Sequence, residues 1–132
     1  MSYRAAGAVQ AAVHAVLTGH PDLAGVPVMD AVPSGGGVGT FVLIGPEEVR
    51  DASDGSGAGA VHRVDVSVLS DAAGFLAAKA AAGAVCDAME GLILPATEGR
   101  VVGVVFLKAV ARRLKDGEVR RIDLSFRVRV EV

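Results

Sequence analysis

Residues 118–132 alternate between apolar and polar side chains, a pattern that predicts one long β-strand at the end of the chain. The apolar residues share one parity: Ile122, Leu124, Phe126, Val128, Val130 and Val132. The polar residues share the other: Arg121, Asp123, Ser125, Arg127, Arg129 and Glu131. Because successive side chains of a strand point to opposite faces, the first set is predicted to enter a core.

Residues 101–114 are predicted to form the antiparallel partner of this strand, with a tight turn at residues 115–118 between them. A two-residue turn at Asp116 and Gly117 would fix which residues lie opposite each other. The inward pairs are then Leu107 with Phe126 and Val105 with Val128, and the outward pairs are Phe106 with Arg127, Val104 with Arg129, and Arg112 with Arg121. A change of one residue in the turn would invert this pattern.

The outward face of this hairpin is unusual for a surface in water. One strand is apolar on both faces, whereas a solvated face of an antiparallel sheet normally carries polar residues on each strand. Arg112 and Arg121 lie side by side, which is unfavourable unless another group neutralises them. Two explanations fit this pattern. Either a second subunit or another layer covers the face, or residues 101–107 form a central strand with helices or loops on both sides.

Two helices and three shorter strands are predicted upstream of the hairpin. Ser2 can cap a helix that ends near Leu17, and Ser70 or Asp71 can cap a second helix that ends near Glu90. Both segments have an apolar stripe at helical spacing. The predicted strands cover residues 26–32, 40–44 and 60–69. The order α-β-β-β-α-β-β predicts an α+β fold, in which two helices pack on a mixed, largely antiparallel sheet of about five strands.

The bulk properties of the chain favour one domain that buries surface against partners. A length of 132 residues suits a single domain spanning residues 1–132. The formal charge of −2 implies no general attraction to nucleic acid. Hydrophobic residues make up 52% of the chain and the mean hydropathy is +0.48, yet charged residues interrupt the apolar runs, so no membrane span is predicted. The richness in alanine and valine is also compatible with genomic composition. The one cysteine, Cys86, excludes an internal disulfide and has the surroundings of a buried helix residue.

Two segments are predicted to be loops. Residues 34–39 are nearly all glycine, and residues 47–59 are acidic and rich in glycine and serine. The first does not match a phosphate-binding loop, because it lacks the lysine before Thr40 and precedes a strand. The second does not have the spacing of a calcium loop. A loop as long as the second one, within so small a domain, usually has a function or is disordered.

No group of residues in the sequence points to catalysis. The histidines are scattered and have no ligand at metal spacing: His14, His20 and His62. Glu47 and Glu48 lie on a predicted loop, which is a poor platform for acid–base chemistry. We therefore expect no cofactor and no enzymatic activity. The strongest local charge comes from four arginines at the hairpin tip: Arg112, Arg113, Arg120 and Arg121. They fit a solvated tip as well as a contact with an acidic surface or a phosphate backbone.

Several short segments, taken in order, form a recognisable set. They are Val28-Met29-Asp30-Ala31-Val32-Pro33, Phe41-Val42-Leu43-Ile44-Gly45, His62-Arg63-Val64-Asp65-Val66-Ser67-Val68-Leu69-Ser70, Ala77-Ala78-Lys79-Ala80, and Ala111-Arg112-Arg113-Leu114 with Asp116-Gly117. This set resembles a small tail-completion family of tailed phages and gene transfer agents, and the similarity spans nearly the whole chain.

The resemblance implies a structural virion protein similar to tail terminators. Such proteins form a ring, usually hexameric, that caps the finished tail tube, stops its polymerisation and offers a docking surface to the head connector. The implied partners are further copies of the chain, the tail tube protein and the head–tail connector or stopper protein. DNA would only pass through the channel, and no membrane is involved. The implied location is the head–tail junction of a virion or gene transfer agent particle that is assembled in the bacterial cytoplasm.

Two sets of residues are candidates for these contacts. The outward face of the hairpin supplies the candidates for the subunit interface: Phe106, Arg112, Arg121, Arg127 and Arg129. The acidic loop supplies the candidates for contact with the tube or connector: Arg50, Asp51, Asp54, Gly55 and Gly57. A flexible, polar loop of this kind can become ordered when it binds a partner.

Two alternatives to a tail terminator remain open at this point. One is another ring-forming part of the same particle, such as a stopper or a tube subunit. The other is a small α+β enzyme or ligand-binding domain, which would need a pocket with converging polar groups.

Overall fold

The computed structural model describes residues 3–31, 39–53, 58–114 and 117–131. The helices are α1 (Ala6–Thr18), the short 3-10 helix η1 (Pro21–Leu23) and α2 (Leu76–Met89). The strands are β1 (Val28–Met29), β2 (Thr40–Asp51), β3 (Gly59–Ser70), β4 (Arg100–Leu114) and β5 (Val119–Glu131). They form a five-stranded sheet in the order β1-β2-β3-β5-β4, which is parallel between β1 and β2 and antiparallel elsewhere. The predicted α+β fold and its element order are confirmed.

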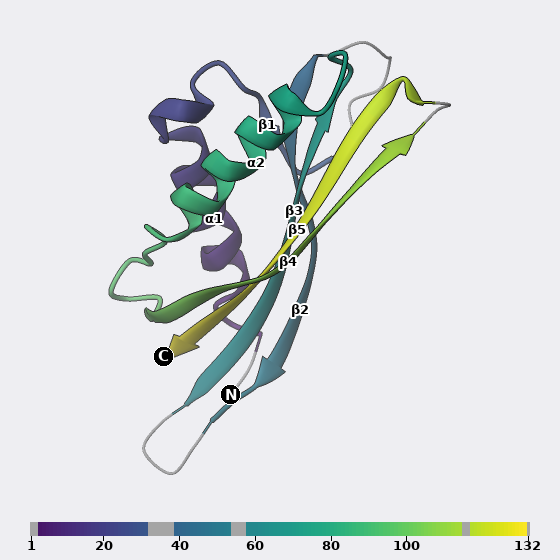
Figure 1. Ribbon diagram of the computed structural model, residues 1–132. Coiled ribbons are helices and arrows are strands. Elements are labelled where there is room, and N and C mark those ends of the chain that lie inside the picture. Colours follow the sequence, from purple (N-terminus) through teal and green to yellow (C-terminus); the bar gives the residue numbers. More distant parts are fainter. Residues whose placement is uncertain (1–2, 32–38, 54–57, 115–116, 132) are drawn as a thin grey trace.

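The core lies between the sheet and the two long helices. Figure 1 shows α1 and α2 on the same face of a long, twisted sheet, and the ends of β2 and β3 projecting beyond them. The apolar residues at the even-numbered positions of β5, from Ile122 to Val130, are at most 3% exposed. This burial confirms the predicted alternation. Val132 lies outside the described residues. Small side chains on α2 let this helix pack closely against the sheet.

Both helices begin later than predicted. α1 begins at Ala6 without a side-chain capping bond, and Ser2 lies outside the described residues. α2 begins at Leu76, so the predicted caps at Ser70 and Asp71 are wrong. Ser70 is the last residue of β3, and its hydroxyl group lies 2.8 Å from a hydroxyl group on β2. The sheet therefore uses the side chain that the sequence pattern assigned to the helix.

The strands before α2 also differ in length from the prediction. β1 contains only Val28 and Met29. β2 continues to Asp51, so the first part of the predicted loop at residues 47–59 is strand, and the end of that range, Gly59, belongs to β3. Glu48 and Arg50 keep their side chains 57% and 77% exposed on one face of this strand, so the sheet continues here without burying these charges. Residues 32–38 and 54–57 lie outside the described residues.

The β4–β5 hairpin follows the predicted register only in its upper half, from Leu114 down to Lys108. Leu107 and Val102 then have no partner on β5, so each is a β-bulge that shifts the register by one residue. The pairs predicted for residues 104–107 are therefore wrong. The observed pairs are Phe106 with Phe126, Val105 with Arg127, Val104 with Val128, and Gly103 with Arg129.

β4 is an edge strand of the sheet, since β5 is its neighbour on one side and the described chain supplies none on the other. The interpretation of residues 101–107 as a central strand is therefore wrong. The other explanation, in which a second subunit or another layer covers this face, stays a prediction.

Candidate functional site

The most unusual surface of the molecule runs along β4. It consists of exposed apolar side chains, which we call the β4 edge surface: Val102, Val105, Phe106, Leu107 and Val110. Each of these side chains is between 41% and 50% exposed. The two bulges turn successive apolar residues toward different sides of the strand, so the surface wraps around the edge of the sheet. Contiguous apolar patches of this kind on a soluble protein mark sites of interaction.

A shallow groove of about 260 Å³ separates β4 from α2 on the helix-covered face of the sheet. Its lining is largely apolar and includes Ala82 on α2 and Ala109 on β4, with Lys79 as its one charged residue. Phe106 borders the groove, and its ring centroid lies 5.9 Å from that of the buried Phe126. The ring of Phe106 therefore has support from the core on one side and water on the other.

On the opposite face, Arg112 and Arg121 share one counter-charge within the chain. Asp123 lies between them, with Oδ2 at 3.1 Å from Arg112 Nη2 and Oδ1 at 2.8 Å from Arg121 Nε. The Ser67 hydroxyl also donates a hydrogen bond of 2.6 Å to Asp123 Oδ1. Burial alone raises the pKa of Asp123, but the hydrogen bonds from Ser67 and Arg121 and the charges of both arginines outweigh it, so this pKa lies below its ordinary value. One carboxylate thus offsets one of the two positive charges, which relieves the repulsion between the arginines within the subunit.

The other two arginines of the hairpin tip have a different environment. Arg113 and Arg120 lie opposite each other and face the ring of Phe75, at 5.4 and 5.9 Å from its centroid. Lys79 of α2 lies 5.8 Å from the same centroid. Arg120 also donates a hydrogen bond of 3.3 Å to the carbonyl group of Ala72. These three cations form no ion pair with any described residue, so the tip of the hairpin is a positively charged end of the molecule.

The structure does not bring all the predicted interface residues onto one face. Phe106 is on the helix-covered face, whereas Arg112, Arg121, Arg127 and Arg129 are on the opposite face. Arg129 donates a hydrogen bond of 3.1 Å to the carbonyl group of Ala52, and Arg127 is exposed.

The residues predicted to contact the tube or connector fall into two groups. Arg50 and Asp51 are the last residues of β2, and Arg50 Nε lies 2.6 Å from Glu48 Oε1. The hydrogen bond from Ser53 lowers the pKa of Asp51. The other three candidates lie outside the described residues: Asp54, Gly55 and Gly57.

The remaining titratable groups do not converge on a reaction centre. His62 is fully buried with Nδ1 at 3.4 Å from Glu47 Oε2, while His14 and His20 belong to or follow α1. Cys86 is half-buried, and burial together with the nearby charges of Asp87 and Glu90 raises the pKa of its thiol, which favours the protonated form. Among the described residues, no group of three or more His, Cys, Asp or Glu side chains could hold a metal ion. No helix in this part of the chain is long and apolar enough to cross a membrane.

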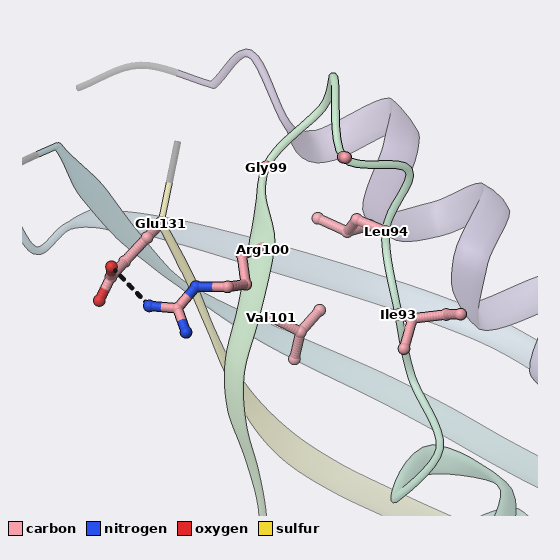
Figure 2. Close-up of a pocket in the computed structure, with 7 residues that line it drawn as sticks. Ile93, Leu94, Gly99, Arg100, Val101 and Glu131 are labelled. Carbon is pink, nitrogen blue, oxygen red and sulfur yellow. Dashed lines mark hydrogen bonds and ion pairs between the residues drawn. The ribbon is translucent and has the colours of Figure 1, made fainter.

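A second hollow, of about 540 Å³, opens at the start of β4. Figure 2 shows Ile93 and Leu94 on one side of it and Arg100, paired with Glu131 across 3.2 Å, on the other. Ile93 is 75% exposed. The hollow is wide and has one ion pair that is already satisfied, so it offers no set of converging polar groups for a small ligand.

Comparison with known proteins decides the family. A model of the family described as "Tail completion protein gp17" matches residues 4–131. The chain belongs to this tail completion family. A solved structure titled "Virion of native gene transfer agent (GTA) particle" contains a chain with 54% sequence identity and a TM-score of 0.85, and the match covers 99% of this chain and 100% of that one. A search of curated protein sequences finds no match.

Membership of the tail completion family makes this chain a structural, tail-associated virion protein, as the sequence motifs indicated. The analysis of single residues missed two features of the surface. One is the pairing of Asp123 with Arg112 and Arg121: Asp123 lies two residues after Arg121 and therefore on the same face of β5. The other is the cluster of Lys79, Arg113 and Arg120 around Phe75, which joins three separate elements and has no signal in local sequence.

Proposed function

We propose that this protein forms a closed ring that caps the finished tail tube, stops its polymerisation and joins the tail to the head connector. In our proposal the ring contains six copies and lies at the head–tail junction, and DNA passes through its channel during delivery. The observation that carries the proposal is the β4 edge surface, on a chain that belongs to the tail completion family.

The physical argument starts from the unpaired side of β4. An edge strand presents a row of free backbone N–H and C=O groups, and soluble proteins normally protect such an edge with short strands or charges. β4 instead has fifteen residues and exposes five large apolar side chains. A ring interface would cover them with a different surface of the next copy, because contacts in a ring are heterologous.

We also propose that the end of the β2–β3 hairpin contacts the tube or the connector. Arg50 and Asp51 lie at the base of this end, and the segment from Asp54 to Gly57 connects the two strands. The projection of β2 and β3 beyond the helices supports this role, because it lets the hairpin reach another protein without moving the core (Figure 1).

The test is the size of the purified protein, alone and mixed with the tail tube subunit, measured by light scattering and electron microscopy. A closed ring that binds tube ends and halts their growth is the expected result. Open-ended polymerisation of the protein alone would identify a tube subunit instead. A closed ring that leaves tube growth unchanged would favour a stopper. A monomer that does not respond to the tube subunit would contradict the proposal.

A further inference from the structure

One end of the sheet carries three cations that no acidic side chain of the described residues balances. Lys79, Arg113 and Arg120 place their charged groups 5.8, 5.4 and 5.9 Å from the centroid of the Phe75 ring. We call these three side chains the basic cluster. The aromatic ring attracts each cation, but the three like charges also repel one another. A negatively charged group placed among them would relieve this repulsion.

The acidic residues at the same end do not pair with the basic cluster. Asp71 accepts a hydrogen bond of 3.3 Å from the backbone N–H of Gly39. Glu118 is exposed and forms no ion pair with a described residue. Arg120 Nε is buried without a hydrogen-bond partner in the described part of the chain. Since a buried charged group without a partner is costly, an anion bound to this cluster would stabilise it.

The start of α2 adds to the positive potential of the basic cluster. The helix begins directly after Phe75, with no side-chain cap and no acidic residue in its first turn. The first backbone N–H groups of a helix have no partner within the helix and favour negative charge nearby. Because the three cations gather around Phe75, these N–H groups and the cations attract an anion to the same place.

An exposed leucine adjoins the basic cluster. Leu76 follows Phe75 directly and is 85% exposed. Lys79 lies three residues after Leu76, so the two side chains are neighbours on the surface of α2. A ligand that covers this surface needs a negative group for the cations and an apolar group for the leucine. An acidic protein segment that contains an apolar residue supplies both.

The same features disfavour a DNA backbone as the ligand. A phosphate backbone is bound by cations that follow its path, whereas these cations surround a single ring. The ring of Phe75 is half-buried and already faces three side chains, so it is not a free platform for stacking a base. Phosphate groups would also leave Leu76 without an apolar partner.

The basic cluster and the end of the β2–β3 hairpin lie at opposite ends of the sheet (Figure 1). On β3, Ser70 pairs with Arg120 at one end, and Ala60 pairs with Asp51 at the other. Residues 47–51 contain three acidic residues and one basic residue, a net charge of −2. The two ends therefore carry opposite charge. The β4 edge surface lies along the side of the strands, so a ring built on it leaves both ends available to other proteins.

From these observations we propose that the basic cluster binds an acidic segment of a protein stacked on the ring, and that an apolar residue of this segment covers Leu76. The protein is the one, tube subunit or connector, that the end of the β2–β3 hairpin does not contact. The opposite charges of the two ends would then determine which side of the ring faces the head. This inference rests on the proposed function and adds the chemistry of its second contact.

Charge reversal tests the site. Arg113→Glu and Lys79→Glu proteins are compared with Arg63→Glu, a matched control on the opposite face of the sheet whose side chain is 46% exposed. Biolayer interferometry measures binding to the purified tube subunit and to the purified connector protein, in low and high salt. We expect each cluster variant to lose roughly tenfold in affinity for one of the two proteins and to bind the other normally. The control should bind both like the parent protein, and high salt should weaken the affected contact in the parent.

A second variant tests the apolar part of the site. Leu76→Ser retains every charge of the basic cluster and removes apolar area that the partner would bury. Binding to the same protein should weaken by about threefold or more, with the salt dependence of the parent.

The outcomes separate the two levels of the proposal. Cluster variants that bind both proteins like the parent overturn the site and leave the proposed function standing. Variants that bind both proteins normally but lose binding to a DNA duplex, or lose ring formation, assign the cluster to DNA or to the contact between copies and overturn the site as well. A parent protein that binds neither protein and forms no ring overturns both. All variants change exposed positions, and unchanged circular dichroism and melting temperature would show that they are folded.

Discussion

β4 and β5 are neighbours in one hairpin and both are rich in apolar residues, yet their environments are opposite. β5 has a strand on each side, and its alternating apolar residues are almost fully buried. β4 has a strand on one side, and its apolar residues are nearly half exposed. The comparison shows that the arrangement of apolar residues is more informative than their number. Strict alternation of apolar and polar residues indicates burial inside the subunit. An apolar edge strand without this alternation indicates a surface suited to contact with another chain.

The largest expected effect on stability comes from truncating one of the two phenylalanines that lie opposite each other, Phe126 on β5 and Phe106 on β4. Phe126→Ala removes a ring that is 1% exposed, so we expect a loss of about 3–5 kcal/mol in the free energy of unfolding, measured by urea denaturation. Phe106→Ala is the matched change on β4. Because Phe106 is 50% exposed, its truncation should cost about 1 kcal/mol or less in the subunit but should weaken the ring. Equal losses of stability for both variants would remove the distinction between the strands.

A second prediction concerns the polar face of the hairpin, where Asp123 pairs with one arginine of each strand. Asp123→Asn keeps the shape of the side chain and removes its charge, which leaves Arg112 and Arg121 side by side. We expect a loss of about 1–2 kcal/mol in the free energy of unfolding at neutral pH. Urea denaturation in low and high salt would check it, because salt should reduce the loss. A variant as stable as the parent protein would show that the arginines are solvated and need no counter-charge.

The lowered pKa of Asp123 gives a third prediction, of smaller size. A carboxyl group with a lowered pKa in the folded state adds stability above its unfolded pKa, about 4, and this contribution is lost as the pH falls through the folded value. The parent protein should therefore lose stability below pH 4 more steeply than Asp123→Asn. Thermal unfolding between pH 2 and 6 measures the difference. Identical slopes for the two proteins would contradict the assignment of this effect to Asp123.

The smallest effect on the subunit is expected for the apolar surface itself. Val110 is 47% exposed and lies opposite Asp123, so Val110→Thr should change the free energy of unfolding by no more than about 0.5 kcal/mol. Chemical denaturation checks the stability, and light scattering checks whether the ring persists. A loss well above this value would mean that β4 is held within the subunit more tightly than its exposure indicates.

The sequence was sufficient for the fold class because the strongest patterns belong to the core. Alternation along β5 and apolar stripes on the helices arise from burial within the subunit, and burial leaves a periodic signal. The end of β2 was missed because Glu48 and Arg50 keep their side chains exposed there, so this part of the strand lacks the apolar alternation that burial produces. The start of α2 was missed because Ser70, a good helix cap by residue type, is used by the sheet.

The candidate site was less predictable, for a physical reason. The register of a hairpin depends on bulges, and neither Leu107 nor Val102 differs in character from its neighbours. The sequence therefore indicated an apolar strand that needs cover but placed its side chains on the wrong faces. The position of β4 at the edge depends on the strand order, which no local pattern encodes.

The two bulges of β4 also bear on how the free subunit avoids aggregation. Long, regular and apolar edge strands stack with their own kind into fibrils, because identical ladders of backbone hydrogen bonds can repeat without end. Leu107 and Val102 interrupt that ladder and increase the local twist, so a second β4 meets a mismatched template. The same irregularities that obscure the strand in the sequence can thus keep newly made chains dispersed until the correct neighbour arrives.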